Sequence, residues 1–152
     1  MPGFAASTKS LLAVDHEPGL LSASTTITKL PAQDLDRARA FYRDKLGLTP
    51  VEKREGGLRY VGASGEFHLF LSTGAPSGES TQMGFEVDDI DAVIAELRSR
   101  GVVFGEIDAP GFKVVDGIVE VEGNYPSKGK GERGIFFHDS EDNLLALGQA
   151  VG

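Results

Sequence analysis

Histidine is the side chain in this sequence best suited to proton transfer near neutral pH, because its ordinary pKa lies close to neutrality. One of the three histidines, His68, lies in residues 66–72, where apolar and polar side chains alternate as in a half-buried strand. Alternation places most apolar residues of this run on one face and His68 with Phe70 on the other. We predict that His68 contacts a ligand or acts as an acid or base. The alternative is that a neighbour, such as Gln82 or a backbone carbonyl, satisfies it.

The other two histidines stand beside carboxylates, a combination that can bind a metal. His16 is the centre of Asp-His-Glu at residues 15–17, and residues 138–142 read His-Asp-Ser-Glu-Asp. We interpret the first group as a solvated charge cluster and the second as a structural turn, in which Asp139 or Asn143 bonds to the local backbone. The sequence contains no cysteine, which excludes disulfides and thiolate metal sites and favours a reducing cytoplasm.

A long glycine-rich segment at residues 122–133 is a candidate ligand-binding loop. Its Gly-Lys-Gly sequence lacks the spacing of a phosphate-binding P-loop and the Ser or Thr that follows the Lys there. We predict either a mobile lid, in which Asn124, Tyr125 and Arg133 contact the ligand, or an ordinary crossover between strands.

The elements that must position these residues occur twice. Asp34 precedes an amphipathic helical pattern that ends at Gly47, and Asp89 precedes a second pattern that ends at Gly101. Asp caps the start of a helix, and Gly adopts the left-handed conformation that ends one. A strand pattern precedes each helix, at residues 25–30 and 82–87. The spacing of the two caps, 89 − 34 = 55 residues, indicates an internal repeat.

Short strand patterns follow each helix. They lie at residues 49–53, 58–62 and 66–72 after the first helix, and at residues 102–107, 113–122, 134–138 and 144–149 after the second. The coarse order is β-α-β-β-β, repeated, which predicts an α+β domain with antiparallel strands and a helix over one face of each sheet. The uncovered faces of a curved sheet would then enclose a cavity.

The composition fits one folded domain and excludes several partners. The 152 residues are 40% hydrophobic and 25% charged, with a formal net charge of −8. A negative surface repels nucleic-acid phosphates and anionic lipids, so we expect neither nucleic acid nor membrane as a partner. We predict a flexible or loosely docked extension over residues 1–24, without the character of a signal peptide. One domain would follow over residues 25–150, with modules at about 25–75 and 80–150.

Three motifs, in this order, resemble those of the vicinal-oxygen-chelate superfamily, which includes glyoxalases, bleomycin resistance proteins and ring-cleaving dioxygenases. Residues 30–48 contain the Asp-Leu, Phe-Tyr and Leu-Gly pairs of the usual opening. Residues 85–91, FEVDDID, resemble the opening of the second module, and residues 136–147, FFHDSEDNLLAL, resemble the closing hairpin. The resemblance implies two βαβββ modules in one chain that form a cup-shaped, mostly antiparallel sheet around a small-molecule site.

Metal-dependent members of this family hold a metal through one ligand in each of four strands. The resemblance places these positions at Ile27, His68, Gln82 and Ala146. An aliphatic side chain offers no donor atom, and a divalent ion wants three or more nitrogen or oxygen ligands. We therefore predict no metal and no other cofactor. The alternative is a divalent metal ion held by a ligand set that the motifs do not reveal.

The implied cup has apolar walls with a few polar groups, which is typical of pockets for small organic molecules. We expect its lining to comprise Ile27, Tyr60, His68, Phe70, Gln82, Phe136 and Ala146, together with the loop residues Asn124, Tyr125 and Arg133. The leading hypothesis is a metal-free small-molecule-binding protein that forms a homodimer, as such relatives usually do. The alternative is a lyase, isomerase or dioxygenase that uses His68 as acid or base, or uses a divalent ion.

Overall fold

Ten strands and two helices make up the part of the chain that the structure describes. The structure is a computed structural model, and it describes residues 15–105, 112–122 and 131–151. The first half contains β1 (Thr28–Ala32), α2 (Leu35–Leu46), β2 (Glu52–Arg54), β3 (Gly57–Val61) and β4 (Glu66–Leu71). The second half contains β5 (Thr81–Glu86), α3 (Ile90–Ser99), β6 (Phe104–Gly105), β7 (Lys113–Val115), β8 (Ile118–Glu122), β9 (Gly131–His138) and β10 (Leu144–Val151). The predicted α+β class is confirmed.

Both helices are capped as the sequence predicted. The Asp34 side chain accepts a hydrogen bond at 2.9 Å from the backbone amide three residues on, and Asp89 accepts the equivalent bond at 3.1 Å. Gly47 takes the left-handed conformation directly after α2, with φ 71°. Glycine adopts this backbone without the steric cost that a Cβ would add. The caps therefore fix where each helix starts, and so how it lies on its sheet.

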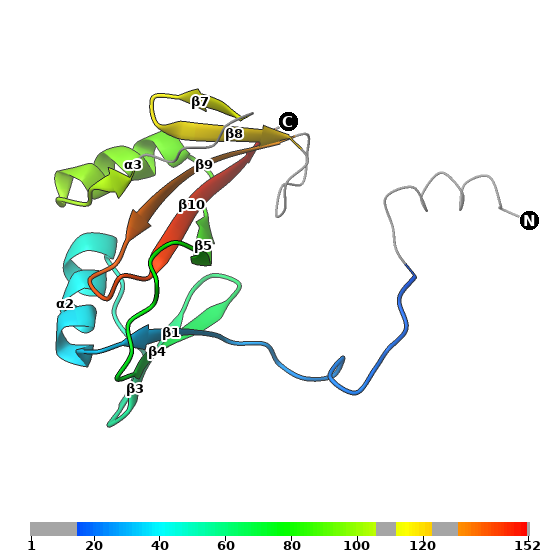
Figure 1. The fold of residues 1–152 in the computed structure, drawn as a ribbon, viewed down its shortest axis with the longest axis vertical. Coiled ribbons are helices and arrows are strands. Elements are labelled where there is room, and N and C mark those ends of the chain that lie inside the picture. Colours follow the sequence, from blue (N-terminus) through cyan, green and yellow to red (C-terminus); the bar gives the residue numbers. More distant parts are fainter. Residues whose placement is uncertain (1–14, 106–111, 123–130, 152) are drawn as a thin grey trace, which may run out of the picture.

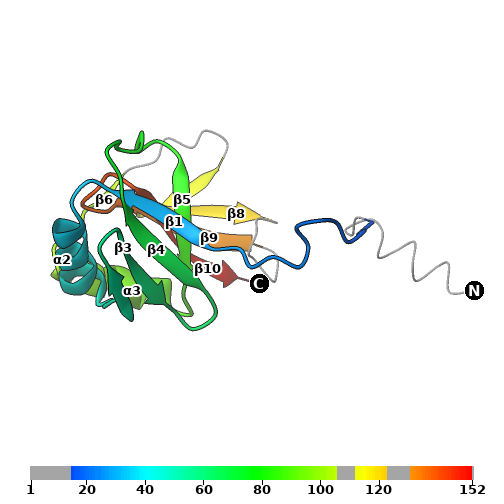
Figure 2. The ribbon, with the colours of Figure 1, turned by 90° about the horizontal axis from the view of Figure 1, so that it is seen from below.

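The two modules repeat one arrangement of strands. The first sheet has the order β1-β4-β3-β2, and the second has the order β5-β10-β9-β8-β7 with β6 beside β9. In each module the first strand pairs in parallel with the last, β1 with β4 and β5 with β10, while the other pairs are antiparallel. Figure 1 shows both helices on one side of the sheets, and Figure 2 shows the strands from below. We call the sheet faces turned away from the helices the inner faces.

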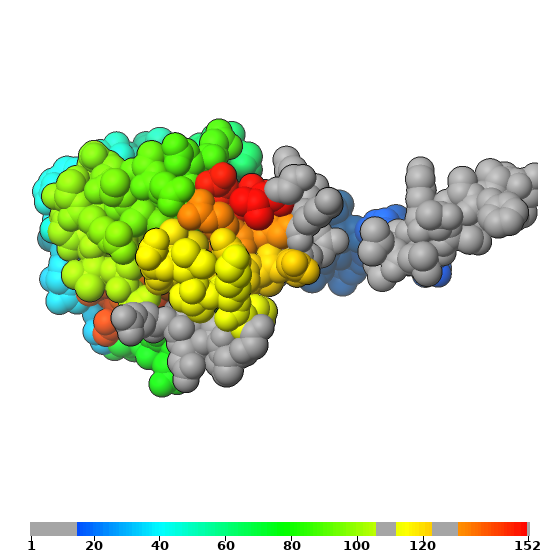
Figure 3. All heavy atoms as spheres, turned by 90° about the horizontal axis from the view of Figure 1, so that it is seen from above, coloured from blue at the N-terminus to red at the C-terminus, as the bar shows by residue number. Residues whose placement is uncertain are grey.

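The segment predicted as one strand at residues 113–122 is a β-hairpin, so that prediction was wrong. β7 pairs with β8, and Asp116 and Gly117 form the turn with φ of 54° and 80°. Asp-Gly suits such a turn because both of its central residues need positive φ. The hairpin (yellow in Figure 3) lies on the surface beside α3. The strand predicted at residues 102–107 is shorter in the described part of the chain, where β6 spans Phe104–Gly105.

The core lies between the helices and the sheets. Alternate strand residues such as Leu30, Leu69 and Leu145 are fully buried on the faces that the helices cover. Tyr42 of α2 is also fully buried, and Phe41 packs against the same cluster. Both aromatic residues of α2 therefore serve helix packing.

The turn between β9 and β10 joins the two modules. Oδ1 of Asp139 accepts hydrogen bonds from the backbone amides of Glu141 and Asn143, and the Tyr42 hydroxyl donates to its Oδ2 at 2.7 Å. The buried Glu141 carboxylate accepts two bonds from Arg37, each 2.9 Å long. Burial alone would raise the pKa of Glu141, but the bond from Arg37 and further hydrogen bonds outweigh it and lower the pKa to about 2. The predicted structural turn is confirmed.

Residues 15–24 form no strand or helix, and every one of them is exposed. They lead away from the body of the molecule in Figure 1. The cluster at residues 15–17 lies in this exposed segment, and His138 is exposed at the end of β9, with Nε2 2.7 Å from the Gly78 carbonyl oxygen. Within the described residues, neither helix has the length and apolar character needed to cross a bilayer.

Candidate functional site

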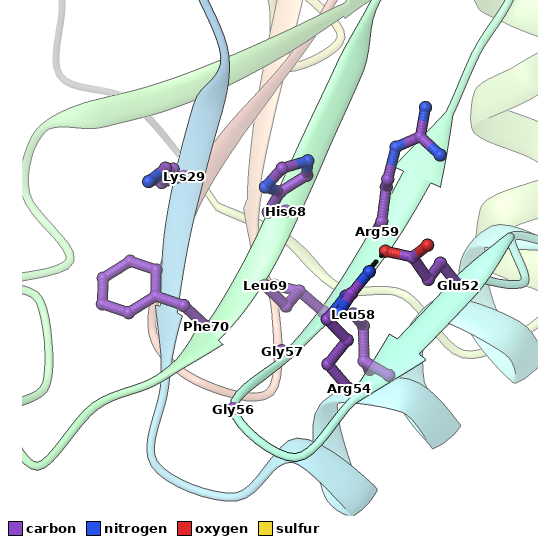
Figure 4. A pocket seen from close by; sticks show the side chains of 10 residues that line it. All are labelled: Lys29, Glu52, Arg54, Gly56, Gly57, Leu58, Arg59, His68, Leu69 and Phe70. Atoms are coloured by element: carbon purple, nitrogen blue, oxygen red, sulfur yellow. Dashed lines mark hydrogen bonds and ion pairs between the residues drawn. The ribbon is translucent and has the colours of Figure 1, made fainter.

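A pocket of about 560 Å³ lies on the inner face of the first sheet. Pockets of this size accommodate small organic molecules. Figure 4 shows the lining, which comes from the four strands β1 to β4 and the turn between β2 and β3: Lys29, Glu52, Arg54, Gly56, Gly57, Leu58, Arg59, His68, Leu69 and Phe70. Of the residues that the sequence predicted for the site, His68 and Phe70 are in this lining.

Three basic side chains stand in register across the pocket. His68 on β4 pairs with Lys29 on β1 and with Arg59 on β3. Paired residues on neighbouring strands point to the same face, with Cβ atoms about 5 Å apart. The flanking β4 residues Phe67 and Leu69 are buried on the opposite face. Strand alternation therefore places His68 on the inner face, as the sequence predicted.

Glu66 connects two of these basic groups. Arg59 donates to both carboxylate oxygens of Glu66, from Nε at 3.0 Å and from Nη2 at 3.1 Å. Nε2 of His68 lies 2.9 Å from Oε1 of the same carboxylate. The bond from Arg59, followed by the one from His68, lowers the pKa of Glu66 to about 2. The same contact raises the pKa of Arg59.

The Glu66 carboxylate also determines which nitrogen of His68 carries a proton. An ionised carboxylate can only accept, so Nε2 must donate, and Nδ1 of a neutral imidazole is then the acceptor. Sequence reasoning missed Glu66 as the residue that orients His68. The available signal was its place two residues before His68 on the same strand, because such residues share a face.

Phe70 provides the aromatic part of the pocket. It is 37% exposed and stands opposite Gly57, which has no side chain to cover the ring. A Cβ on Gly57 would lie 2.9 Å from the backbone oxygen of Leu69. Close approach of β3 and β4 therefore requires glycine here, and the same glycine leaves space beside the Phe70 ring.

Four other residues predicted for the lining lie outside this pocket. Ala146 and Phe136 pair with each other on β10 and β9 and are half-buried, while Gln82 is exposed on β5. Ile27 precedes β1 and is 37% exposed. In the described part of the chain, the structure thus brings together His68 and Phe70 but places these four elsewhere on the surface.

The positions that the resemblance assigns to a metal do not form a donor set. Ile27 and Ala146 carry aliphatic side chains, and Nε2 of His68 is engaged by Glu66. The described residues contain no group of three or more His, Asp or Glu side chains placed to hold an ion. The residues present therefore do not fit the metal of the family's enzymes.

Tyr60 and Arg133, both predicted for the site, lie on the sheet faces that the helices cover, so these two predictions were wrong. Tyr60 is 2% exposed, and its ring stacks on Phe67 with centroids 4.8 Å apart, because it alternates with Arg59 and so belongs to the core face of β3. Arg133 lies on the helix side of β9 and donates two bonds of 3.0 Å to Asp91 in the first turn of α3. Two other residues predicted for the site, Asn124 and Tyr125, lie outside the described residues.

A carboxyl pair that sequence reasoning also missed lies on the inner face of the second sheet. Gly148 separates Glu86 and Glu132, and a Cβ at Gly148 would lie 2.6 Å from Oε1 of each. Glu132 is 8% exposed, and its Oε2 is buried without a hydrogen-bond partner. Burial, followed by the contact with Glu86, raises the pKa of Glu132 to about 7. Glu132 therefore titrates near neutral pH, well above an ordinary carboxyl group.

A βαβββ module paired with a second module of six strands and one helix, with a pocket on an inner sheet face, defines a recognisable class of α+β domain. Residues 24–147 match the family model described as the Glyoxalase/Bleomycin resistance protein/Dioxygenase superfamily. The chain belongs to this superfamily, as the motifs predicted. No curated protein sequence matches the chain.

Solved structures share the fold at low sequence identity. A glyoxalase/bleomycin resistance protein/dioxygenase from Alicyclobacillus acidocaldarius is 18% identical, with a TM-score of 0.62, and the match covers 86% of this chain and 93% of that one. TnmS3, an antibiotic-binding protein from Streptomyces, is 21% identical, with a TM-score of 0.55 and coverages of 92% and 99%. The genomically encoded fosfomycin resistance protein FosX from Listeria monocytogenes is 14% identical, with a TM-score of 0.58 and coverages of 85% and 94%. At these identities the likeness concerns the fold, and function must be argued from the site.

Proposed function

We propose that this chain is a small-molecule-binding protein of the glyoxalase/bleomycin resistance type that works without the family's metal centre. The observation that carries the proposal is the 560 Å³ pocket on the inner face of the first sheet, in which the Phe70 ring stands beside the polar groups of Lys29, Arg59 and His68. An apolar surface with a few placed polar groups is the usual composition of an organic-ligand site. The antibiotic-binding neighbour is consistent with this proposal.

Binding without metal follows from the chemistry of the donor positions. Two of the four positions offer no donor atom, and the His68 nitrogen nearest a carboxylate is already hydrogen-bonded. A ligand would instead meet ammonium, guanidinium and imidazole groups directly. We therefore assign ligand binding to protein side chains alone. The pocket bears on neither the predicted homodimer nor the predicted cytoplasmic location, and both stay predictions.

Catalysis by His68 is a second candidate function, favoured by one contact. The carboxylate of Glu66 fixes the imidazole through Nε2, and Nδ1 has no partner in the described part of the chain. A neutral imidazole oriented in this way can accept a proton at Nδ1 from a bound substrate. In this role Glu66 is a positioning residue, because it acts through His68.

A ligand screen on metal-stripped protein tests the proposed function. The full chain is treated with a chelator, and a library of aromatic and heteroaromatic compounds is examined by protein-observed NMR. We expect ligands that shift the amide signals of β3 and β4, and we expect Phe70→Ala to weaken their binding about tenfold or more. Val103→Ala removes an exposed apolar side chain from the other module and is the matched control.

Two results would contradict the proposal. One is a tightly held stoichiometric divalent ion whose removal abolishes ligand binding. The other is a set of ligands that shift only signals of the second sheet. Turnover of a bound compound that is lost in His68→Ala, but kept in Phe70→Ala at saturating compound, would establish the second candidate function instead.

A further inference from the structure

We propose that the ligand of this pocket is an organic anion: a carboxylate or sulfonate group attached to an aromatic body. This inference rests on the proposed function and specifies its ligand class. The acidic group would lie along the row Lys29, His68 and Arg59, and the aromatic body would lie on Phe70.

The charge in the pocket is opposite to that of the whole chain. The chain carries a formal net charge of −8, yet three cations at the pocket, Lys29, Arg54 and Arg59, outnumber two carboxylates: Glu52 in the lining and Glu66, which bonds to Arg59. Charges separated by more than about 8 Å are largely screened at physiological salt. The local cations therefore outweigh the distant acidic surface for a ligand within the pocket.

Internal ion pairs leave part of this positive charge available. Arg54 pairs with Glu52 at 3.0 Å, and Arg59 pairs with Glu66. Lys29 makes no hydrogen bond or ion pair within the described residues, and Nη1 of Arg59 makes none there either. One whole ammonium group and one edge of a guanidinium thus remain as donors, and both bond carboxylate or sulfonate oxygens strongly.

The positions of the donors select the shape of the ligand. Lys29 and Arg59 stand on strands to either side of His68, and Phe70 follows two residues further along β4 on the same face. Figure 4 shows Lys29, His68 and Phe70 on adjoining strands of the pocket. A flat ring on Phe70 would bring a substituent of one or two atoms to the basic row, because residues two apart on a strand are about 7 Å apart.

Three isosteric probes test the charge preference on the full-length, metal-stripped protein. They are 2-naphthoate, neutral 2-naphthamide and cationic 2-naphthylmethylammonium, each titrated by protein-observed NMR at neutral pH. We expect naphthoate to bind at least tenfold more tightly than either of the others. Lys29→Gln should weaken naphthoate binding about three- to tenfold and leave naphthamide binding unchanged. Lys113→Gln, which removes an exposed lysine from the other sheet, should change neither.

The outcomes separate this inference from the proposed function. Equal binding of naphthoate and naphthamide, or tightest binding of the ammonium probe, would overturn the anion assignment while confirming that the pocket binds aromatic molecules. A Lys29→Gln effect of equal size on all three probes would also overturn it, since that pattern reports a change of shape. Failure of all three probes while other library compounds shift β3 and β4 signals would overturn the aryl-acid assignment alone. Failure of the whole library would overturn the proposed function.

Discussion

The wild type is expected to lose stability as the pH rises from acidic to neutral, and replacement of Glu132 by Gln should abolish that loss. The Glu132 carboxyl group is buried, and burial followed by the neighbouring Glu86 raises its pKa to about 7. No cation in the described part of the chain pairs with Glu132. The folded protein therefore retains the Glu132 proton to a higher pH than the unfolded chain does.

The two pKa values of Glu132 determine the size and sign of this effect. The value rises from 4.5 in the unfolded chain to about 7 in the fold, which corresponds to about 3.5 kcal/mol at about 1.4 kcal/mol per pH unit. Because the pKa is raised, the stabilising contribution is complete below about pH 4.5 and is lost as the pH rises through about 7. Between about pH 5 and about pH 8 the free energy of unfolding should fall by about 2.5 kcal/mol on account of Glu132.

Urea unfolding of the full chain at about pH 5 and about pH 8 measures this loss. Glu132→Gln cannot titrate, so its free energy of unfolding should fall less than that of the wild type by about 2.5 kcal/mol. Glu55→Gln changes an exposed carboxylate in the β2–β3 turn and should behave as the wild type. Equal pH dependence in the wild type and Glu132→Gln would refute the reasoning. Glu86→Gln gives a second test, because without the neighbouring carboxyl the loss should be smaller.

Three further predictions concern the module junction and the pocket. Glu141→Ala should lower the free energy of unfolding by about 2 kcal/mol or more, because Arg37 and two backbone amides lose a buried acceptor. Thermal unfolding of this variant, compared with that of the wild type and of Arg37→Gln, measures the loss. Gly57→Ala should destabilise by about 1 to 3 kcal/mol, since the new Cβ meets a backbone oxygen that cannot move aside, whereas a change of only a few tenths would contradict this. Glu66→Gln should remove a stabilising contribution that the wild type has above about pH 4.5 and loses as the pH falls towards 2, so the two proteins should converge in acid urea titrations.

The capping and alternation of the sequence were sufficient to predict the α+β class and the order of its elements, while the cup-shaped arrangement was implied by the family resemblance. Local rules decide capping and alternation, as the caps Asp34 and Asp89 show. The turn at Asp116 was missed although its Asp-Gly signal is local, because the β-branched residues on both sides read as one continuous strand.

The site was harder to predict, because pairing across strands decides which side chains meet. Arg133 was expected in a loop since the strand was predicted to begin at residue 134, but β9 begins at Gly131 and places Arg133 on the helix side. Tyr60 was expected in the cup for its aromatic ring, although strand alternation already groups it with the buried Leu58 on the core face of β3. The spacing of Glu66 and His68 predicts that they share a face, but their hydrogen bond also depends on side-chain conformations.

The pairing of the strands explains why the first module holds the pocket. In the first sheet Lys29, His68 and Arg59 are paired across β1, β4 and β3; the same positions in the second sheet are Gly84, Ala146 and Phe136 across β5, β10 and β9.

On the faces that the helices cover, both modules carry apolar residues at paired positions. Leu30 pairs with Leu69 in the first sheet, and Phe85 pairs with Leu147 in the second, all of them apolar. Packing against a helix restricts that face to apolar residues in both modules, whereas the pocket leaves the inner face of the first module open to polar side chains. The first module carries charged groups at the three inner positions, and the second carries small or aromatic groups at the same positions. We infer that this difference reflects a ligand on the inner face of the first module. This asymmetry is why we assign ligand recognition to Lys29 and its paired neighbours rather than to Ala146.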